Sequence, residues 1–211
     1  MDGGDARAAM NRMYGWTRHV YDATRKYYLL GRDAMIENLN VYPGMRVCEV
    51  GCGTARNLIK IARRWPGATL SGVDASDAML VTARANLARA GLSGHIALAQ
   101  GLAQDFAGGP YDRVVFSYAL SIIPPWREAL DHALDLLGPG GEVHIVDFGG
   151  MEGVPGPARA ALFWWLALFG VHWKPEVVAR LRALDSSTGT RLVRLSPHRG
   201  GYAYHAVLRK A

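Results

Sequence analysis

The chain has 211 residues, half of them apolar, which is enough for the core of one α/β domain with a short extension. Its most apolar segment, residues 158–171, is too short for a membrane span, which needs roughly 20 residues. The first residues lack the basic region and apolar run of a secretory signal. We therefore expect a single domain over residues 1–211, located in the cytoplasm.

The formal charge of +6 is concentrated at the C-terminal end. Residues 151–211 contain nine basic and three acidic residues, beside the apolar segment. This pairing favours an anionic partner, either a membrane or a nucleic acid, although a merely solvated basic face is the alternative. Tryptophans prefer the bilayer interface, and Trp164 and Trp165 lie in the apolar segment. We therefore expect peripheral membrane association with anionic lipids, and no nucleic acid partner.

The cysteine and histidine spacing predicts no metal site and no disulfide. Cys48 and Cys52 are four positions apart, which fits neither a disulfide framework nor a zinc motif, so we expect two reduced thiols. The seven histidines lack paired spacing. His144 lies inside an apolar run, so we interpret it as a core residue rather than a base.

Apolar runs and turn signals divide the chain into alternating elements. Residues 5–40 have rough helical periodicity, and Gly138–Gly141 reads as a turn. The expected strands are residues 45–50, 68–73, 95–99, 111–116 and 142–148. The expected helices are residues 55–65, 77–90, 125–137, 157–170 and 175–185. Strands that alternate with helices of this length predict a parallel, doubly wound α/β sheet.

The C-terminal end breaks the alternation. Two apolar runs, residues 190–195 and 202–209, are separated by a short loop, which predicts an antiparallel hairpin. Five parallel strands plus a hairpin are similar to the Rossmann-like fold of the class I methyltransferases, with a mostly parallel seven-stranded sheet. Residues 1–40 then form a helical lid and residues 45–211 the core. A nicotinamide-binding domain would continue with a sixth parallel strand.

A glycine-rich loop follows the first expected strand. Gly51 and Gly53 allow the backbone to approach a ligand closely, and the next helix offers free N–H groups to a carboxylate. The dinucleotide motif G-x-G-x-x-G fails because its last position is Arg56. The loop resembles the methyltransferase motif E/D-x-G-x-G-x-G, with Glu49 as its acid and Ala55 in place of the third glycine.

An acid at the end of the second strand supports a nucleoside site. Asp74 lies 23 positions after Gly51, where a carboxylate accepts both ribose hydroxyls; capping the next helix is the alternative role for Asp74 or Ser76. Met79 is placed to lie on the adenine. Relatives often carry an aspartate at the position of Leu102, so backbone groups or Gln104 would read the adenine amine. The expected cofactor contacts in this part of the chain are Glu49, Gly51, Cys52, Gly53, Thr54, Asn57, Asp74, Ala75, Met79, Gly101, Leu102, Ala103 and Ser117.

Longer stretches resemble a narrower family. They are residues 21–33 (YDATRKYYLLGRD), 117–124 (SYALSIIP), 146–150 (VDFGG) and 199–202 (RGGY). These resemble the diacylglycerylhomoserine N-methyltransferases of bacterial betaine-lipid synthesis over nearly the full length. The second stretch is also similar to phospholipid N-methyltransferases.

The resemblance implies three methyl transfers from S-adenosylmethionine to the amine of a diacylglycerol-linked homoserine. It implies an N-terminal lid in which Tyr14, Tyr21, Arg25 and Tyr28 cover the cofactor and the substrate. Tyr21 and Tyr118 are the candidate catalytic residues, since aromatic faces stabilise a forming ammonium and the hydroxyls can receive the amine proton. Arg25 or Arg32 can hold a carboxylate.

The apolar segment is the expected entry for the lipid. Around it, Arg159, Lys174, Arg180 and Arg182 can meet anionic head groups, and ordinary packing on the sheet is the alternative. Phosphatidylethanolamine N-methylation is the next reading, followed by small-molecule or quinone methylation. An RNA-binding or RNA-modifying protein and a non-catalytic cofactor-binding module are the alternatives from other classes.

Overall fold

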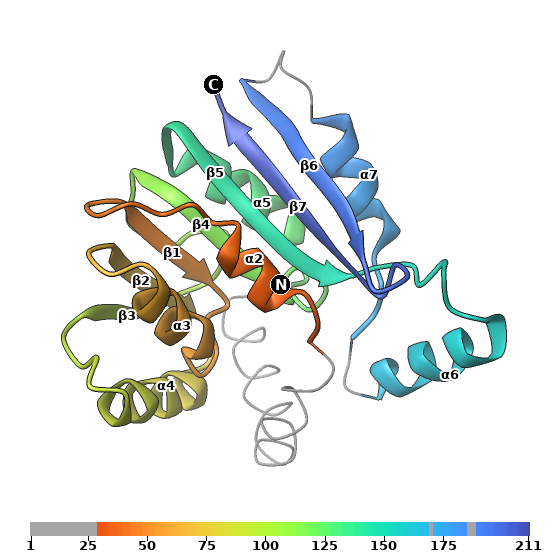
Figure 1. Ribbon diagram of the computed structural model, residues 1–211, viewed down its shortest axis with the longest axis horizontal. Coiled ribbons are helices and arrows are strands. Elements are labelled where there is room, and N and C mark those ends of the chain that lie inside the picture. The colour runs from red at the N-terminus through yellow and green to blue at the C-terminus, as the bar shows by residue number, and fades with distance from the viewer. Residues whose placement is uncertain (1–28, 169–170, 185–188) are drawn as a thin grey trace.

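The computed structural model describes residues 29–168, 171–184 and 189–211, which form a seven-stranded sheet flanked by helices (Figure 1). The strand order is β3-β2-β1-β4-β5-β7-β6, with β7 antiparallel to both of its neighbours and the other pairs parallel. The strands are β1 (Arg46–Val50), β2 (Thr69–Asp74), β3 (Ile96–Gln100), β4 (Tyr111–Ser117), β5 (Leu137–Phe148), β6 (Thr190–His198) and β7 (Ala203–Lys210). The predicted Rossmann-like methyltransferase fold with its C-terminal hairpin is confirmed.

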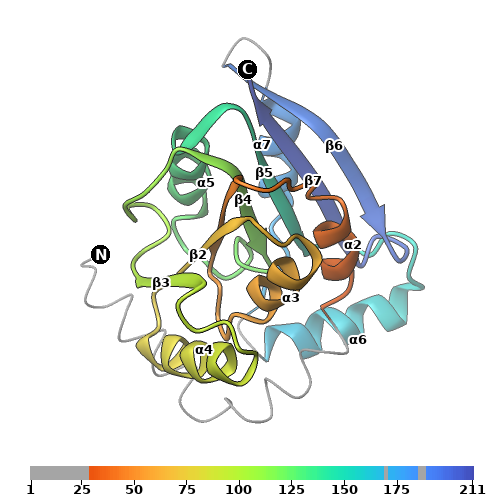
Figure 2. The ribbon, with the colours of Figure 1, turned by 60° about the vertical axis from the view of Figure 1, so that its left-hand side comes forward.

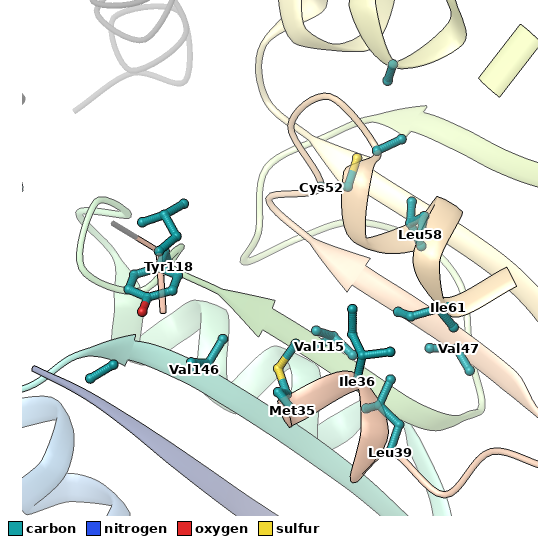
Figure 3. Packing of buried hydrophobic residues seen from close by; sticks show 14 of the residues in the cluster. Met35, Ile36, Leu39, Val47, Cys52, Leu58, Ile61, Val115, Tyr118 and Val146 are labelled. Carbon is teal, nitrogen blue, oxygen red and sulfur yellow. The ribbon is translucent and has the colours of Figure 1, made fainter. Parts of the chain in front are cut away.

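Helices cover both faces of the sheet (Figure 2). The described helices are α2 (Arg32–Glu37), α3 (Arg56–Arg64), α4 (Asp77–Arg89), α5 (Trp126–Asp135), α6 (Gly156–Ala167) and α7 (Pro175–Ala183). Residues of α2, α3, α4 and α6 share one buried apolar cluster, and residues of α5 and α7 share the other. In the first cluster, Met35 and Ile36 of α2 lie over Val115 and Val146 of the sheet (Figure 3).

The predicted turn at Gly138–Gly141 is wrong. Those residues belong to β5, whose pairing with β4 shifts register between Tyr111 and Arg113. The irregularity accommodates glycines that read as a turn in the sequence. The last strand pair also extends further than expected, since β6 continues to His198 through Pro197, which an edge strand tolerates.

The helical regions at the two ends agree with the expectations only in part. Of the expected helix over residues 5–40, the described residues contain α2 alone, and residues 1–28 lie outside them. In α6, Leu166 is the only fully buried residue. Trp164 and Leu168 are 66% and 62% exposed. No helix among the described residues is long and apolar enough to cross a membrane.

A buried ionic cluster joins β4, β5 and β7 within the sheet. Glu142 accepts hydrogen bonds from Arg209, lies 3.0 Å from His144 Nε2 and pairs with Arg113 Nε at 3.4 Å. These partners lower the pKa of Glu142 to about 2, with the His144 hydrogen bond as the main cause and burial opposing it. His144 is therefore a core residue, as expected, and its ring stacks on His205 at 5.7 Å between centroids.

The two cysteines are free and buried, as predicted. Burial raises the pKa of Cys48 to about 11, so this thiol stays protonated at neutral pH. Among the described residues, no group of three or more metal-ligating side chains comes together.

His205 makes the folded state sensitive to acid. Burial, helped by the neighbouring His144 and Arg194, lowers the pKa of His205 from 6.5 to about 4. The unfolded chain binds a proton on His205 more readily than the folded protein does. The stability that the neutral His205 ring contributes is therefore complete above pH 6.5 and is lost as the pH falls towards 4. Between pH 7 and pH 5, wild-type protein should lose about 2 kcal/mol more stability than His205→Gln in urea titrations. The exposed His95→Gln is the control, and equal losses in wild type and His205→Gln would contradict the assignment.

Candidate active site

The glycine-rich loop joins β1 to α3 through a run of left-handed backbone. Gly51, Gly53 and Ala55 have φ values of +70°, +52° and +61°. The Gly51 N–H donates to the Val73 carbonyl of β2 at 2.8 Å, and a Cβ on Gly51 would lie 3.0 Å from the Cβ of Ala119. Ala55 occupies the position of the motif's third glycine and adopts the conformation that glycine takes without strain. The loop thus keeps its shape despite the substitution.

Asp74 ties this loop to the end of β2. One carboxylate oxygen accepts the Gly53 N–H at 2.8 Å, and the other accepts the Ser76 N–H at 2.9 Å. The helix cap is supplied by Ser76, whose Oγ accepts the Met79 N–H at 3.4 Å. Asp74 also lines the second pocket, so the same carboxylate that holds the loop faces the place where ribose hydroxyls are expected.

Glu49 and Asn57 form the floor of the loop. Glu49 is 1% exposed, and its Oε1 accepts a hydrogen bond from Asn57 Nδ2 at 2.7 Å. Ser117, at the end of β4, has a buried hydroxyl with no hydrogen-bond partner among the described residues. A negative charge and an unused hydroxyl at the base of a glycine loop fit a ligand that carries both a positive charge and polar groups.

Two adjacent pockets open on either side of this loop and share Gly51 and Gly53. Every expected cofactor residue among the described ones lines at least one of them. The first pocket contains Glu49, Gly51, Cys52, Gly53, Thr54, Asn57 and Ser117. The second contains Gly51, Gly53, Asp74, Ala75, Met79, Gly101, Leu102, Ala103, Gln104 and Tyr118. The first is lined by charged side chains of both signs and suits a methionine-type end, whereas the second, between Asp74 and apolar walls, suits an adenosine.

Basic side chains surround the first pocket, and most of them were missed in the sequence. Arg32 lines it as expected for a carboxylate-holding residue, with its Nε donating to the Leu29 carbonyl at 3.1 Å. Arg56, Lys60 and Arg63 line it from one face of α3. Their i, i+4, i+7 spacing was the available signal. An anionic group in the ligand is therefore favoured at this end.

Tyr118 lies at the carboxyl end of β4 with φ +56° (Figure 3). Its hydroxyl donates to the Leu30 carbonyl, and its ring meets Phe148 edge-on at 4.6 Å. Burial raises the pKa of Tyr118 well above 10, and the nearby Asp147 adds to this. The hydroxyl is thus protonated and engaged, so of the two roles expected for Tyr118 the geometry favours the aromatic face over proton acceptance.

The expected lid residues lie outside the described part of the chain. They are Tyr14, Tyr21, Arg25 and Tyr28, and their roles stay predictions. Sequence reasoning also did not assign a role to Asp147, which is 2% exposed beneath the loop that follows β4. Its position inside an apolar strand and the family-like stretch at residues 146–150 did not reveal this role, because its partners are distant in the chain.

The central part of the sequence matches a known family. Residues 47–141, which contain the glycine loop and Asp74, match the family described as methyltransferase domain. This stretch therefore resembles an S-adenosylmethionine-dependent methyltransferase domain, and it lies within a Rossmann-like methyltransferase fold. The cofactor of the domain is S-adenosylmethionine, and the glycine loop, the acid of β2 and the unused polar groups of the pockets fit it.

Similar proteins act on different substrates. A ubiquinone/menaquinone biosynthesis C-methyltransferase of Cereibacter sphaeroides is 27% identical over 56% of this chain and 48% of its own length. A release factor glutamine methyltransferase of Gloeobacter violaceus is 41% identical over 41% of this chain and 39% of its own. The matches to these two curated relatives thus span about half of the relative's length or less.

A solved structure supports the fold over more of the chain. The structure of a SAM-dependent methyltransferase from Aquifex aeolicus superposes with a TM-score of 0.68 at 16% identity, covering 92% of this chain and 96% of its own. At this identity the likeness establishes the fold alone.

Gly51→Ala should weaken the binding of S-adenosylhomocysteine, measured by calorimetry. The added Cβ would lie 3.0 Å from the Cβ of Ala119, at a residue that lines both pockets, and would therefore reduce the space for the ligand. Gly91→Ala is a matched control, because Gly91 has the same φ of +70° but nothing within 4 Å of the new Cβ. We expect both variants to lose about 1 kcal/mol of stability through backbone strain and only Gly51→Ala to lose at least about tenfold in affinity. Equal affinities would show that the ligand does not approach Gly51.

Proposed function

We propose that this chain is an N-methyltransferase that transfers three methyl groups from S-adenosylmethionine to the amine of diacylglycerylhomoserine, giving a trimethylated betaine lipid. The proposal of a lipid as the methyl acceptor rests on the position and exposure of helix α6. Its inner residues, including Leu166, pack in the same apolar cluster as Tyr118, while Trp164 is left exposed. The helix lies at the edge of the molecule, beyond the carboxyl end of β5 (Figure 1). Exposed tryptophan on a helix beside an active site suits a bilayer interface.

Fewer basic groups are available to α6 than expected. Arg159 and Arg182 are exposed, and Arg180 pairs with Asp131 at 3.2 Å. Lys174 is directed inward, with its Nζ donating to two backbone carbonyls, so it does not serve a membrane surface. Arg159 of α6 is therefore the residue that we propose for contact with anionic lipids at the cytoplasmic face of a membrane, whereas Arg182 lies on α7, which packs in the other apolar cluster.

The proposed transfer uses the site as follows. When bound, S-adenosylmethionine supplies an electrophilic methyl group on a sulfonium. Glu49 and the basic rim orient the charged methionine end, and Asp74 orients the ribose. The ring of Tyr118 provides an aromatic face for the amine as it becomes charged. The buried walls exclude water, so the protein contributes mainly alignment and desolvation.

Methylation of a quinone head group is the second candidate function. It is favoured by relatives that include a ubiquinone/menaquinone biosynthesis C-methyltransferase and a demethylmenaquinone methyltransferase, and α6 would serve an isoprenoid lipid equally well. Phosphatidylethanolamine is the alternative acceptor within N-methylation.

Lipid mass analysis tests the acceptor. Purified protein is incubated with labelled S-adenosylmethionine and anionic vesicles that contain diacylglycerylhomoserine, phosphatidylethanolamine or demethylmenaquinone. We expect gains of one, two and three methyl groups on the homoserine lipid alone. Transfer only to phosphatidylethanolamine or only to the quinone would move the assignment to that acceptor, and no transfer with the cofactor bound would remove the lipid proposal.

The same vesicles test whether α6 contacts the membrane. Trp164→Ser removes an interfacial anchor, so we expect vesicle binding and the initial rate on vesicle substrate to fall by about tenfold. The affinity for S-adenosylhomocysteine should stay unchanged. Tyr42→Ser is the matched control, because Tyr42 is 61% exposed but lies just before the start of β1, at the amino ends of the parallel strands, whereas α6 follows the carboxyl end of β5. If both variants bind vesicles like wild type, α6 is not the membrane contact.

A further inference from the structure

The wall of the adenosine pocket is a loop with little regular structure of its own. Residues 118–125, between β4 and α5, contribute six residues to the pocket: Tyr118, Ala119, Ile122, Ile123, Pro124 and Pro125. Among the described residues, the loop's internal backbone bonds are those of Ile122 and Ile123 to the Ala119 carbonyl. A loop with so few internal bonds needs support from elsewhere to keep a fixed pocket wall.

Two side chains from distant elements supply that support. Asp147, near the end of β5, accepts the Ser121 N–H with Oδ2 at 2.9 Å and the Phe148 N–H with Oδ1 at 2.8 Å. Lys174, the residue that precedes α7, donates from Nζ to the carbonyls of Leu120 and Ile123 at 3.0 and 2.9 Å. Three of four consecutive loop residues are therefore held through their backbone by these two side chains.

We propose that Asp147 and Lys174 are positioning residues that set the inner wall of the adenosine pocket, and that they thereby control cofactor affinity. The proposal rests on the proposed use of S-adenosylmethionine but not on the identity of the methyl acceptor. Neither side chain lines the second pocket, so both act through the loop.

The carboxylate needs its charge for this role. An ionised Asp147 accepts both N–H groups, whereas a protonated one loses an acceptor position. Lys174, Tyr118 and Tyr204 are the titratable groups that interact with Asp147 electrostatically. Burial raises the pKa of Asp147 to about 6, and the bonds to Ser121 and Phe148 and the Lys174 charge limit the rise. The loop support should therefore weaken as the pH falls below about 6.

Lysine variants give the first test, with S-adenosylhomocysteine as the probe in calorimetry. Lys174→Met removes both donors but keeps the length of the side chain, and we expect the dissociation constant to rise about tenfold. Lys174→Arg keeps the charge and the donors and should restore affinity to within about threefold. Lys210→Met is the matched control, since Lys210 Nζ donates to the carbonyls of Leu134, Asp135 and Leu137 at the far end of α5. It should lower the melting temperature similarly without changing affinity.

The pH profile gives the second test. Wild-type affinity should fall below about pH 6, whereas Asp147→Asn should bind weakly and with little change between pH 5 and 8. If Lys174→Met loses stability like Lys210→Met but keeps wild-type affinity, the pair is structural only and the proposal is overturned. If wild-type protein does not bind S-adenosylhomocysteine, the pocket assignment fails with it. Failure of lipid methylation alone leaves this binding result intact and therefore concerns only the acceptor.

Discussion

The candidate site depends on one carboxylate that bonds the ends of two neighbouring strands. Asp74 holds the Gly53 N–H of the loop after β1 and the Ser76 N–H at the start of α4. Since it is 8% exposed, these bonds form in a low-dielectric environment where an unpaired charge is costly. The glycine loop is thus fixed in left-handed backbone before any ligand arrives, which lowers the entropy cost of binding.

The rest of the site is built around this fixed loop by residues that are far apart in sequence. Glu49 and Asn57 secure its floor, and the loop after β4 forms the opposite wall of the adenosine pocket. That wall is in turn supported by Asp147 and Lys174. Each layer uses a buried polar side chain to satisfy backbone groups, so the pocket can be irregular without leaving buried groups unpaired.

The sequence predicted the elements whose signals are local. The strands were placed to within a residue or two where apolar runs are bounded by glycine, proline or polar residues, as for β1 and β2. The glycine loop and Asp74 were recognised because their chemistry follows from spacing along the chain. The start of β5 was missed because glycines form a strand irregularity as readily as a turn. Asp147 and Lys174 could not be found, since their roles arise only when β5, α7 and the loop after β4 meet.

The central claim is that S-adenosylmethionine binds at the Asp74 end of β2. Titration of wild type and Asp74→Asn with S-adenosylhomocysteine tests it most directly. Asp112→Asn is the control, because Asp112 also accepts a backbone N–H, that of Arg46 at 2.7 Å, but at the start of β1. We predict that Asp74→Asn alone weakens binding by at least about tenfold. Equal affinity in wild type and Asp74→Asn would contradict the account.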